Sequence, residues 1–190
     1  MSSHIRHRSS HVLLLIDVIN DMVFPGSEAL VEQALPMARR LRALKARLKG
    51  AGVPCVYCND NFGSWRSDFR ALVRHCITDD VPGRPVASLL EPDEDDYFVL
   101  KPRHSAFYAT PLDPLLRELG ADVVILTGIA ANICVLFSAN DAYMRGYKVI
   151  VPADCVASNT AGESAAALRQ IQAVLKADIA ASTELAVERP

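Results

Sequence analysis

The stretch Ala121-Asp-Val-Val-Ile-Leu-Thr-Gly-Ile-Ala-Ala-Asn-Ile-Cys134 joins a short apolar run to a glycine and then to an apolar segment that carries a thiol. The run at residues 122–127 predicts a buried strand, because it is apolar on both faces and short for a helix. Cys134 follows Gly128 by six residues, at the expected start of a helix. Unpaired N–H groups and the helix dipole favour a thiolate there. Taken alone, Cys134 fits a displayed nucleophile and a small buried hydrophobe equally well.

Short apolar runs alternate with longer helical patterns along the rest of the chain. The expected strands are residues 11–17, 53–58, 97–101, 122–127 and 148–152, with a sixth candidate at 178–181. The expected helices are residues 27–49, 69–74, 111–119, the segment that carries Cys134, and 162–176, with a polar, proline-rich connection at 78–96. This alternation predicts an α/β protein with a three-layer α/β/α, Rossmann-like fold and a mainly parallel six-stranded sheet. Residues 11–190 are expected to form one domain after a loose or disordered tail at residues 1–10.

The composition is that of an ordinary globular protein, with 51% hydrophobic and 22% charged residues and a net charge of −2. This charge gives no field that would attract nucleic acid or an anionic membrane. No apolar run reaches the roughly 20 residues that a membrane span needs. The five cysteines are irregularly spaced and follow no signal peptide, so we expect reduced thiols in a cytoplasmic protein.

Polar residues follow several of the expected strands. Asp17 ends the first strand, Asn59 and Asp60 follow the second, and Lys101 ends the third. In open parallel sheets ligands bind beyond the carboxyl ends of the strands, which is also where Cys134 is expected. Considered singly, Asp17 could be a loop carboxylate, and Lys101 could be a surface lysine whose ammonium reaches solvent. Together they predict an active site, because a lysine stabilises a thiolate and a carboxylate can accept the thiol proton.

The chain resembles the isochorismatase-like cysteine hydrolase superfamily, which contains nicotinamidases and N-carbamoylsarcosine amidohydrolase. The resemblance extends over residues 12–182. It is carried by Leu13-Leu-Leu-Ile-Asp-Val-Ile-Asn-Asp21, Val99-Leu-Lys-Pro-Arg-His-Ser-Ala-Phe-Tyr-Ala-Thr-Pro-Leu112, Thr127-Gly-Ile-Ala-Ala-Asn-Ile-Cys134 and Gly146-Tyr-Lys-Val-Ile-Val-Pro-Ala-Asp154. Each motif is weak alone, but their order and spacing are specific.

The resemblance implies a catalytic triad of Asp17, Lys101 and Cys134. It also implies a cis peptide between Ile129 and Ala130 and an oxyanion hole formed by the N–H groups of Ala130 and Cys134. The implied reaction is hydrolysis of a C–N amide or carbamoyl bond of a small molecule through a thioester. A homodimer or homotetramer is implied as well.

Two departures from the family pattern affect the expected chemistry. Nicotinamidases place an aspartate and several histidines after the second strand to hold a metal, whereas residues 59–68 here contain no histidine. We therefore expect no metal, no cofactor and a substrate other than nicotinamide. Ile19 stands where many members have glutamine, which removes a polar group near Asp17. Vinyl-ether hydrolysis of isochorismate, and a non-catalytic binding or assembly role, remain the alternatives.

Aromatic and basic residues near the strand ends are candidates for contacting substrate, and the aromatic residues suggest an apolar, planar ligand. Their other interpretation is that they cover the sheet ends or a subunit contact. Arg66 and Arg103 could grip a carboxylate, and His104 could touch substrate or lie exposed in its loop. The expected substrate-binding residues are Phe24, Phe62, Trp65, Phe107, Tyr108 and Arg103.

Overall fold

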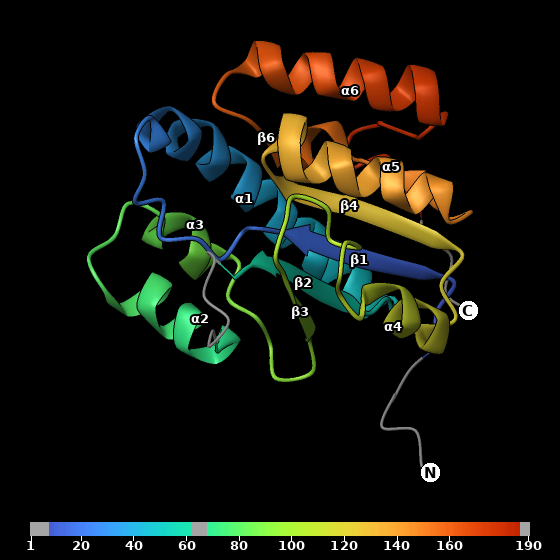
Figure 1. Ribbon diagram of the computed structural model, residues 1–190, viewed down its shortest axis with the longest axis horizontal. Helices are drawn as coiled ribbons and strands as arrows, with labels where there is room; N and C mark the ends of the chain where they lie inside the picture. The colour runs from blue at the N-terminus through green and yellow to red at the C-terminus, as the bar shows by residue number, and fades with distance from the viewer. Residues whose placement is uncertain (1–7, 62–67, 187–190) are drawn as a thin grey trace.

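The computed structural model describes residues 8–61 and 68–186, and these form a parallel sheet between two layers of helices (Figure 1). The strand order is β3-β2-β1-β4-β5, every pair is parallel, and β6 pairs with the second half of β4. The strands are β1 (His11–Ile16), β2 (Cys55–Asp60), β3 (Tyr97–Lys101), β4 (Val123–Ile129), β5 (Lys148–Ile150) and β6 (Val156–Ala157). The predicted three-layer α/β/α fold with a six-stranded, mainly parallel sheet is confirmed.

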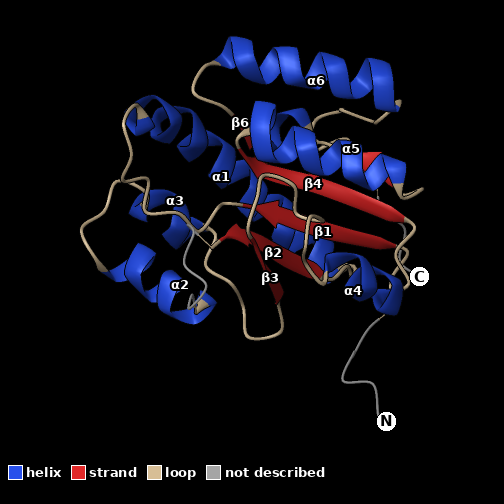
Figure 2. Ribbon diagram, viewed as in Figure 1, coloured by secondary structure: helices blue, strands red, loops and turns tan. Residues whose placement is uncertain are grey.

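Each face of the sheet has its own helices, as Figure 2 shows by colour. One face is covered by α1 (Ser27–Gly50), α2 (Phe69–Thr78) and α3 (Arg84–Leu89). The other is covered by α4 (Leu112–Leu119), α5 (Leu136–Met144) and α6 (Ala161–Leu175). Two short turns complete the chain, the π-helical η1 (Ala131–Val135) and the 3₁₀-helical η2 (Ala153–Cys155).

The central strand β1 shows why its sequence is a continuous apolar run. Leu13 and Leu15 point into the core under α1, while Leu14 and Ile16 point into the core under α4, α5 and α6. All four side chains are fully buried. A strand between two helical layers needs apolar residues on both faces, so no polar alternation remains.

The sixth strand was predicted wrongly at residues 178–181. Asp178 forms only an isolated bridge with Ile150, and β6 is instead the two-residue segment that pairs with Gly128 and Ile129. So short a segment leaves no periodic pattern to detect.

Three smaller differences from prediction have local causes. The second strand begins two residues late and continues to Asp60, because Asn59 and Asp60 still pair with the end of β3. The expected connection at residues 78–96 contains α3, whose six residues are too few for an amphipathic pattern. Within the expected N-terminal tail, Ser9 is buried and its N–H donates to Leu119 O.

The strand order reverses between β1 and β4, which makes their carboxyl ends the topological switch point of the sheet. From β1 the chain builds β2 and β3 on one side and then crosses back to place β4 on the other. Ligand sites of open α/β sheets lie at such a switch point. The two strands approach closely there, because a Cβ on Gly128, whose φ is +107°, would lie 2.1 Å from Ile16 O.

Within residues 8–61 and 68–186, no helix is long and apolar enough to cross a membrane.

Candidate active site

Asp17 is the first residue after β1, and the backbone there turns sharply to leave the sheet. Its φ is +52°, in the left-handed region that few non-glycine residues adopt, and its N–H still donates to Cys58 O at 3.0 Å. One carboxylate oxygen, Oδ1, accepts a hydrogen bond of 2.8 Å from the Asp60 N–H. The end of β2 therefore holds the Asp17 carboxylate at the point where the strand order reverses.

Lys101 ends β3, and its side chain is fully buried among acceptors. Its Nζ lies 2.8 Å from Asp17 Oδ2, 3.5 Å from Cys134 Sγ, 3.6 Å from Asp60 Oδ2 and 3.2 Å from Arg103 O. Burial alone would lower the pKa of Lys101, but the nearby Asp17, Cys134 and Asp60 raise it above its ordinary value. The site therefore holds a permanent ammonium charge against the sulfur.

Cys134 lies in η1 and completes a cluster of three groups from three strand ends. Its sulfur lies 3.5 Å from the Lys101 ammonium, and the Asp17 carboxylate, which is paired with the same ammonium, acts electrostatically on the thiol. Burial, followed by the negative charge of Asp17, raises the pKa of Cys134 to about 12 against the opposing effect of Lys101. Burial also raises the pKa of Asp17, again opposed by Lys101.

A helix start was expected to favour a thiolate at Cys134. The desolvation of the sulfur and the charge of Asp17 act in the opposite direction and raise the pKa of Cys134 against the effect of Lys101. The arrangement is that of a thiol whose proton can pass to Asp17 at the moment of attack.

The turn before Cys134 is held by a network of backbone and side-chain contacts. The peptide bond between Ile129 and Ala130 is cis, the bond that the resemblance singles out. Ala130 O accepts hydrogen bonds from the N–H groups of Ile133 and Val135, and Ser158 Oγ bonds both the N–H and the side chain of Asn132. The backbone N–H groups next to the sulfur are thus carried by a fixed turn.

The expected substrate-binding residues differ in their exposure to solvent. Tyr108, Phe24 and Arg103 are exposed. Phe107 is buried in the core, where its ring packs against Tyr147 and beneath the Arg145 guanidinium, so its position is that of a packing residue rather than a rim residue. The expected residues that lie outside the described part of the chain are Phe62, Trp65 and Arg66.

His104 is the residue that sequence reasoning left undecided and the structure brings to the site. Its Nδ1 lies 3.9 Å from Cys134 Sγ, within hydrogen-bonding range for sulfur, and its ring packs against Phe137 with centroids 5.5 Å apart. The only sequence signal was its position three residues after Lys101.

In the described part of the chain, no three His, Cys, Asp or Glu side chains converge near the end of β2. In residues 59–61 the one carboxylate, Asp60, lies 3.6 Å from the Lys101 ammonium, and His75 is engaged with Asp21 and Asp79. A site for a divalent metal needs several free anionic or imidazole ligands, and this donor set does not fit one.

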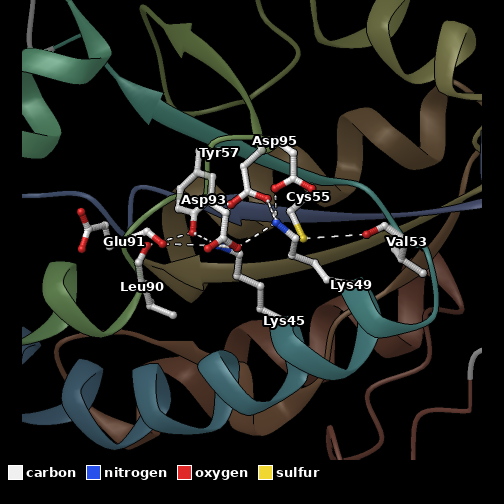
Figure 3. A network of polar contacts seen from close by, with 10 residues as sticks. Lys45, Lys49, Val53, Cys55, Tyr57, Leu90, Glu91, Asp93 and Asp95 are labelled. Atoms are coloured by element: carbon white, nitrogen blue, oxygen red, sulfur yellow. Dashed lines mark hydrogen bonds and ion pairs between the residues drawn. The ribbon is translucent and has the colours of Figure 1, made fainter. Parts of the chain in front are cut away.

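A group of three carboxylates, Asp93, Asp95 and Asp96, lies near the start of β2 and is neutralised by lysines (Figure 3). Lys49 Nζ is within 2.8 Å of an oxygen of each, and Lys45 Nζ is 2.6 Å from Asp96 Oδ2. A cavity of about 840 Å³ adjoins them and is also lined by Cys55, which begins β2. This end of β2 is opposite to the end at which Asp17, Lys101 and Cys134 meet, so the cavity is separate from that cluster.

Comparisons with known proteins show the family and the fold of the chain. The model of the isochorismatase domain matches residues 11–183. YaaI, an isochorismatase family protein of Bacillus subtilis, is 37% identical over 94% of this chain and 97% of its own length. Maleamate amidohydrolase of Pseudomonas putida is 31% identical over 76% of this chain and 70% of its own. The crystal structure of N-carbamoylsarcosine amidase from Thermoplasma acidophilum superposes with a TM-score of 0.72 at 28% identity, covering 94% of this chain and all (100%) of that one.

Proposed function

This chain belongs to the isochorismatase family of hydrolases, and on that basis we propose that it is a metal-independent cysteine hydrolase that cleaves a C–N amide or carbamoyl bond of a small molecule. The observation that carries the proposal is the position of the Cys134 sulfur, which lies 3.5 Å from a Lys101 ammonium that is itself 2.8 Å from the Asp17 carboxylate. A thiol between a proton acceptor and a fixed positive charge is equipped for nucleophilic attack.

In the first half of the proposed reaction the enzyme is acylated. Asp17 takes the thiol proton while the sulfur forms a bond to the substrate carbonyl carbon, and Lys101 balances the charge that develops on sulfur. The carbonyl oxygen becomes an oxyanion, for which the N–H groups of Ala130 and Cys134 are the proposed donors. The C–N bond then breaks, and the nitrogen leaves with the proton held by Asp17. The product of this half is a thioester on Cys134.

In the second half water hydrolyses the thioester. The water oxygen bonds to the acyl carbon, the C–S bond breaks, and the sulfur departs as a thiolate beside Lys101. A permanent ammonium at 3.5 Å stabilises that leaving group in a buried setting, where charges interact more strongly than in water. The acid product leaves and the thiol is restored by a proton.

Two features favour amide hydrolysis over the alternatives. Vinyl-ether hydrolysis of isochorismate needs no thiol, whereas here the thiol lies at the centre of the polar cluster. A binding or assembly role would not require a buried lysine and a buried carboxylate to converge on one sulfur, because each charge is costly to bury. Relatives named for maleamate and for ureidoacrylate point to a small amide or ureido compound as substrate.

We also propose a compartment and an oligomeric state for the enzyme. All five cysteines are free, which suits a reducing compartment such as the cytoplasm. Apolar side chains are exposed on α5, with Phe137 at 53% and Met144 at 79%, and such a face suits the contact of a homodimer or homotetramer.

A substrate panel tests the proposal. Primary amides, ureido acids and isochorismate are incubated with the protein and scored for release of ammonia or pyruvate. We expect ammonia from at least one amide or ureido acid, loss of this activity in Cys134→Ala, and retention in Cys55→Ala, which changes a cysteine at the far end of β2. Full turnover by Cys134→Ala, or release of pyruvate alone, would refute the thiol mechanism.

A further inference from the structure

His104 lies beside the nucleophile on its exposed side. The imidazole is exposed, whereas the side chains of Asp17 and Lys101 are buried. Its Nδ1 is 3.9 Å from Cys134 Sγ. Solvent can therefore reach the imidazole next to the sulfur more readily than it can reach the carboxylate.

The loop that carries His104 is fixed at both ends. Arg103 O, one residue earlier, accepts a hydrogen bond from Lys101 Nζ. On the other side Ser105 Oγ bonds Asp141, and the Ala106 N–H donates to Ser138 Oγ at 2.9 Å. Both contacts lead to α5, the helix that follows Cys134. The loop and the sulfur are therefore held by the same elements, and the imidazole keeps its place against Phe137.

Asp17 is poorly placed to activate a second reactant. Its side chain is 8% exposed, Oδ1 accepts from the Asp60 N–H, and Oδ2 pairs with Lys101. These contacts suit a group that exchanges a proton with the adjacent thiol and leaving nitrogen. A base for incoming water needs an accessible lone pair near the acyl carbon, and histidine commonly serves as one near neutral pH.

We propose that His104 is a further catalytic residue, the general base that activates water to hydrolyse the acyl–Cys134 thioester. Nδ1 accepts a proton from water as the water oxygen bonds to the acyl carbon. The C–S bond breaks, its electron pair returns to sulfur beside Lys101, and the acid departs. The proton on His104 then passes to the sulfur and restores the thiol. This role rests on the proposed cysteine hydrolase function and divides proton transfer between Asp17 in acylation and His104 in deacylation.

The test separates the two half-reactions with 4-nitrophenyl acetate, whose nitrophenolate leaves without needing a proton. Acylation is followed by nitrophenolate absorbance, and the acetyl group on Cys134 by intact-protein mass spectrometry. His104→Asn is the main variant, because the Asn amide can occupy the position of Nδ1 and form hydrogen bonds but cannot take up a proton. His104→Ala removes both functions. His11→Asn is the matched control, since His11 begins β1 at the far end of the strand from Asp17.

For His104→Asn we expect an unchanged burst, accumulation of acetyl-Cys134 and a steady-state rate lower by about 100-fold, the usual size of a general-base contribution. His104→Ala should show the same pattern, and His11→Asn should match wild type. A wild-type steady-state rate in His104→Asn, or a burst that slows in parallel, would overturn the role of His104 while the hydrolase function stands. If wild type released no more nitrophenolate than Cys134→Ala, the thiol mechanism would fail and the role of His104 with it.

Discussion

Replacing Asp17 by Asn should make Cys134 more reactive toward an alkylating agent while it abolishes turnover. In wild type the Cys134 pKa of about 12 leaves about one thiolate in 10⁵ at pH 7. An ordinary cysteine, with a pKa near 8.5, has a few per cent thiolate at that pH. Wild-type Cys134 should therefore react with iodoacetamide about 1,000-fold more slowly than free cysteine, because iodoacetamide consumes the thiolate.

The size of the effect of Asp17→Asn follows from the charge that it removes. A unit charge about 4 Å away is worth about 4 kcal/mol at an effective dielectric constant of about 20, which corresponds to about 3 pKa units. Lys101 Nζ then keeps the Cys134 sulfur at 3.5 Å and Asp60 at 3.6 Å as its anionic partners. Cys134 is only partly buried and solvent reduces the gain, so alkylation at pH 7 should accelerate by about 10²- to 10³-fold. Asparagine also tolerates the left-handed backbone that Asp17 adopts.

The assay is the rate of carbamidomethylation measured by intact-protein mass spectrometry, with Cys134→Ala to assign the site. Ammonia release from the active amide of the substrate panel is measured on the same samples. An Asp17→Asn protein that is alkylated no faster than wild type would refute the view that Asp17 holds the sulfur protonated. Rapid labelling of wild type at pH 6 would refute it equally.

Three further predictions concern stability. Asp96→Asn should lower the free energy of unfolding in urea by about 1.5 to 3 kcal/mol, because it removes the 2.6 Å partner of the buried Lys45, which keeps Asp93 at 3.1 Å. Asp95→Asn, at an exposed carboxylate, should stay within about 0.5 kcal/mol of wild type. Gly128→Ala should lower thermal stability far more than Gly146→Ala. Both glycines have a positive φ, but of the two only Gly128 would place the new Cβ against backbone, 2.1 Å from Ile16 O. Equal losses of stability would contradict the close approach of β1 and β4. Asp79 and Asp21 raise the pKa of His75 in the folded state, so His75→Gln should reduce the urea midpoint at pH 5 to 6. The difference between the two proteins should disappear as pH rises through the raised pKa. A constant difference from pH 5 to 9 would show that the ion pairs of His75 contribute nothing to stability.

The sequence was sufficient for the architecture, because each buried strand requires apolar residues on both faces and each helix leaves a periodic stripe. The same reasoning placed Asp17, Lys101 and Cys134 at one edge of the sheet, since the carboxyl ends of parallel strands coincide there. It could not find β6, whose two residues pair only because β4 continues to Ile129. Such pairing depends on tertiary contacts and leaves no local pattern.

The electrostatic state of the site also lay beyond the sequence. The dipole argument for Cys134 uses local position alone, whereas the pKa depends on how deeply the sulfur is buried and how near Asp17 lies. The same limit applies to Phe107 and His104, which lie three residues apart in one loop. One is buried against Tyr147 and the other faces the sulfur, and only the hydrogen bonds of the intervening residues decide which way each points.

The position of the Lys101 side chain depends on the register of β3, so the proposed activity depends on that register as well. Lys101 ends β3 and meets Asp17 at the end of β1, so its stem must cross the end of β2, a span of two strand spacings or roughly 9.5 Å. A slip of β3 by one residue would turn the side chain to the opposite face of the sheet, under α1. A sheet in which β3 is undocked or out of register therefore cannot place the ammonium beside the sulfur. Recovery of turnover during refolding should require docking of β3 in register and should lag behind recovery of helical circular dichroism.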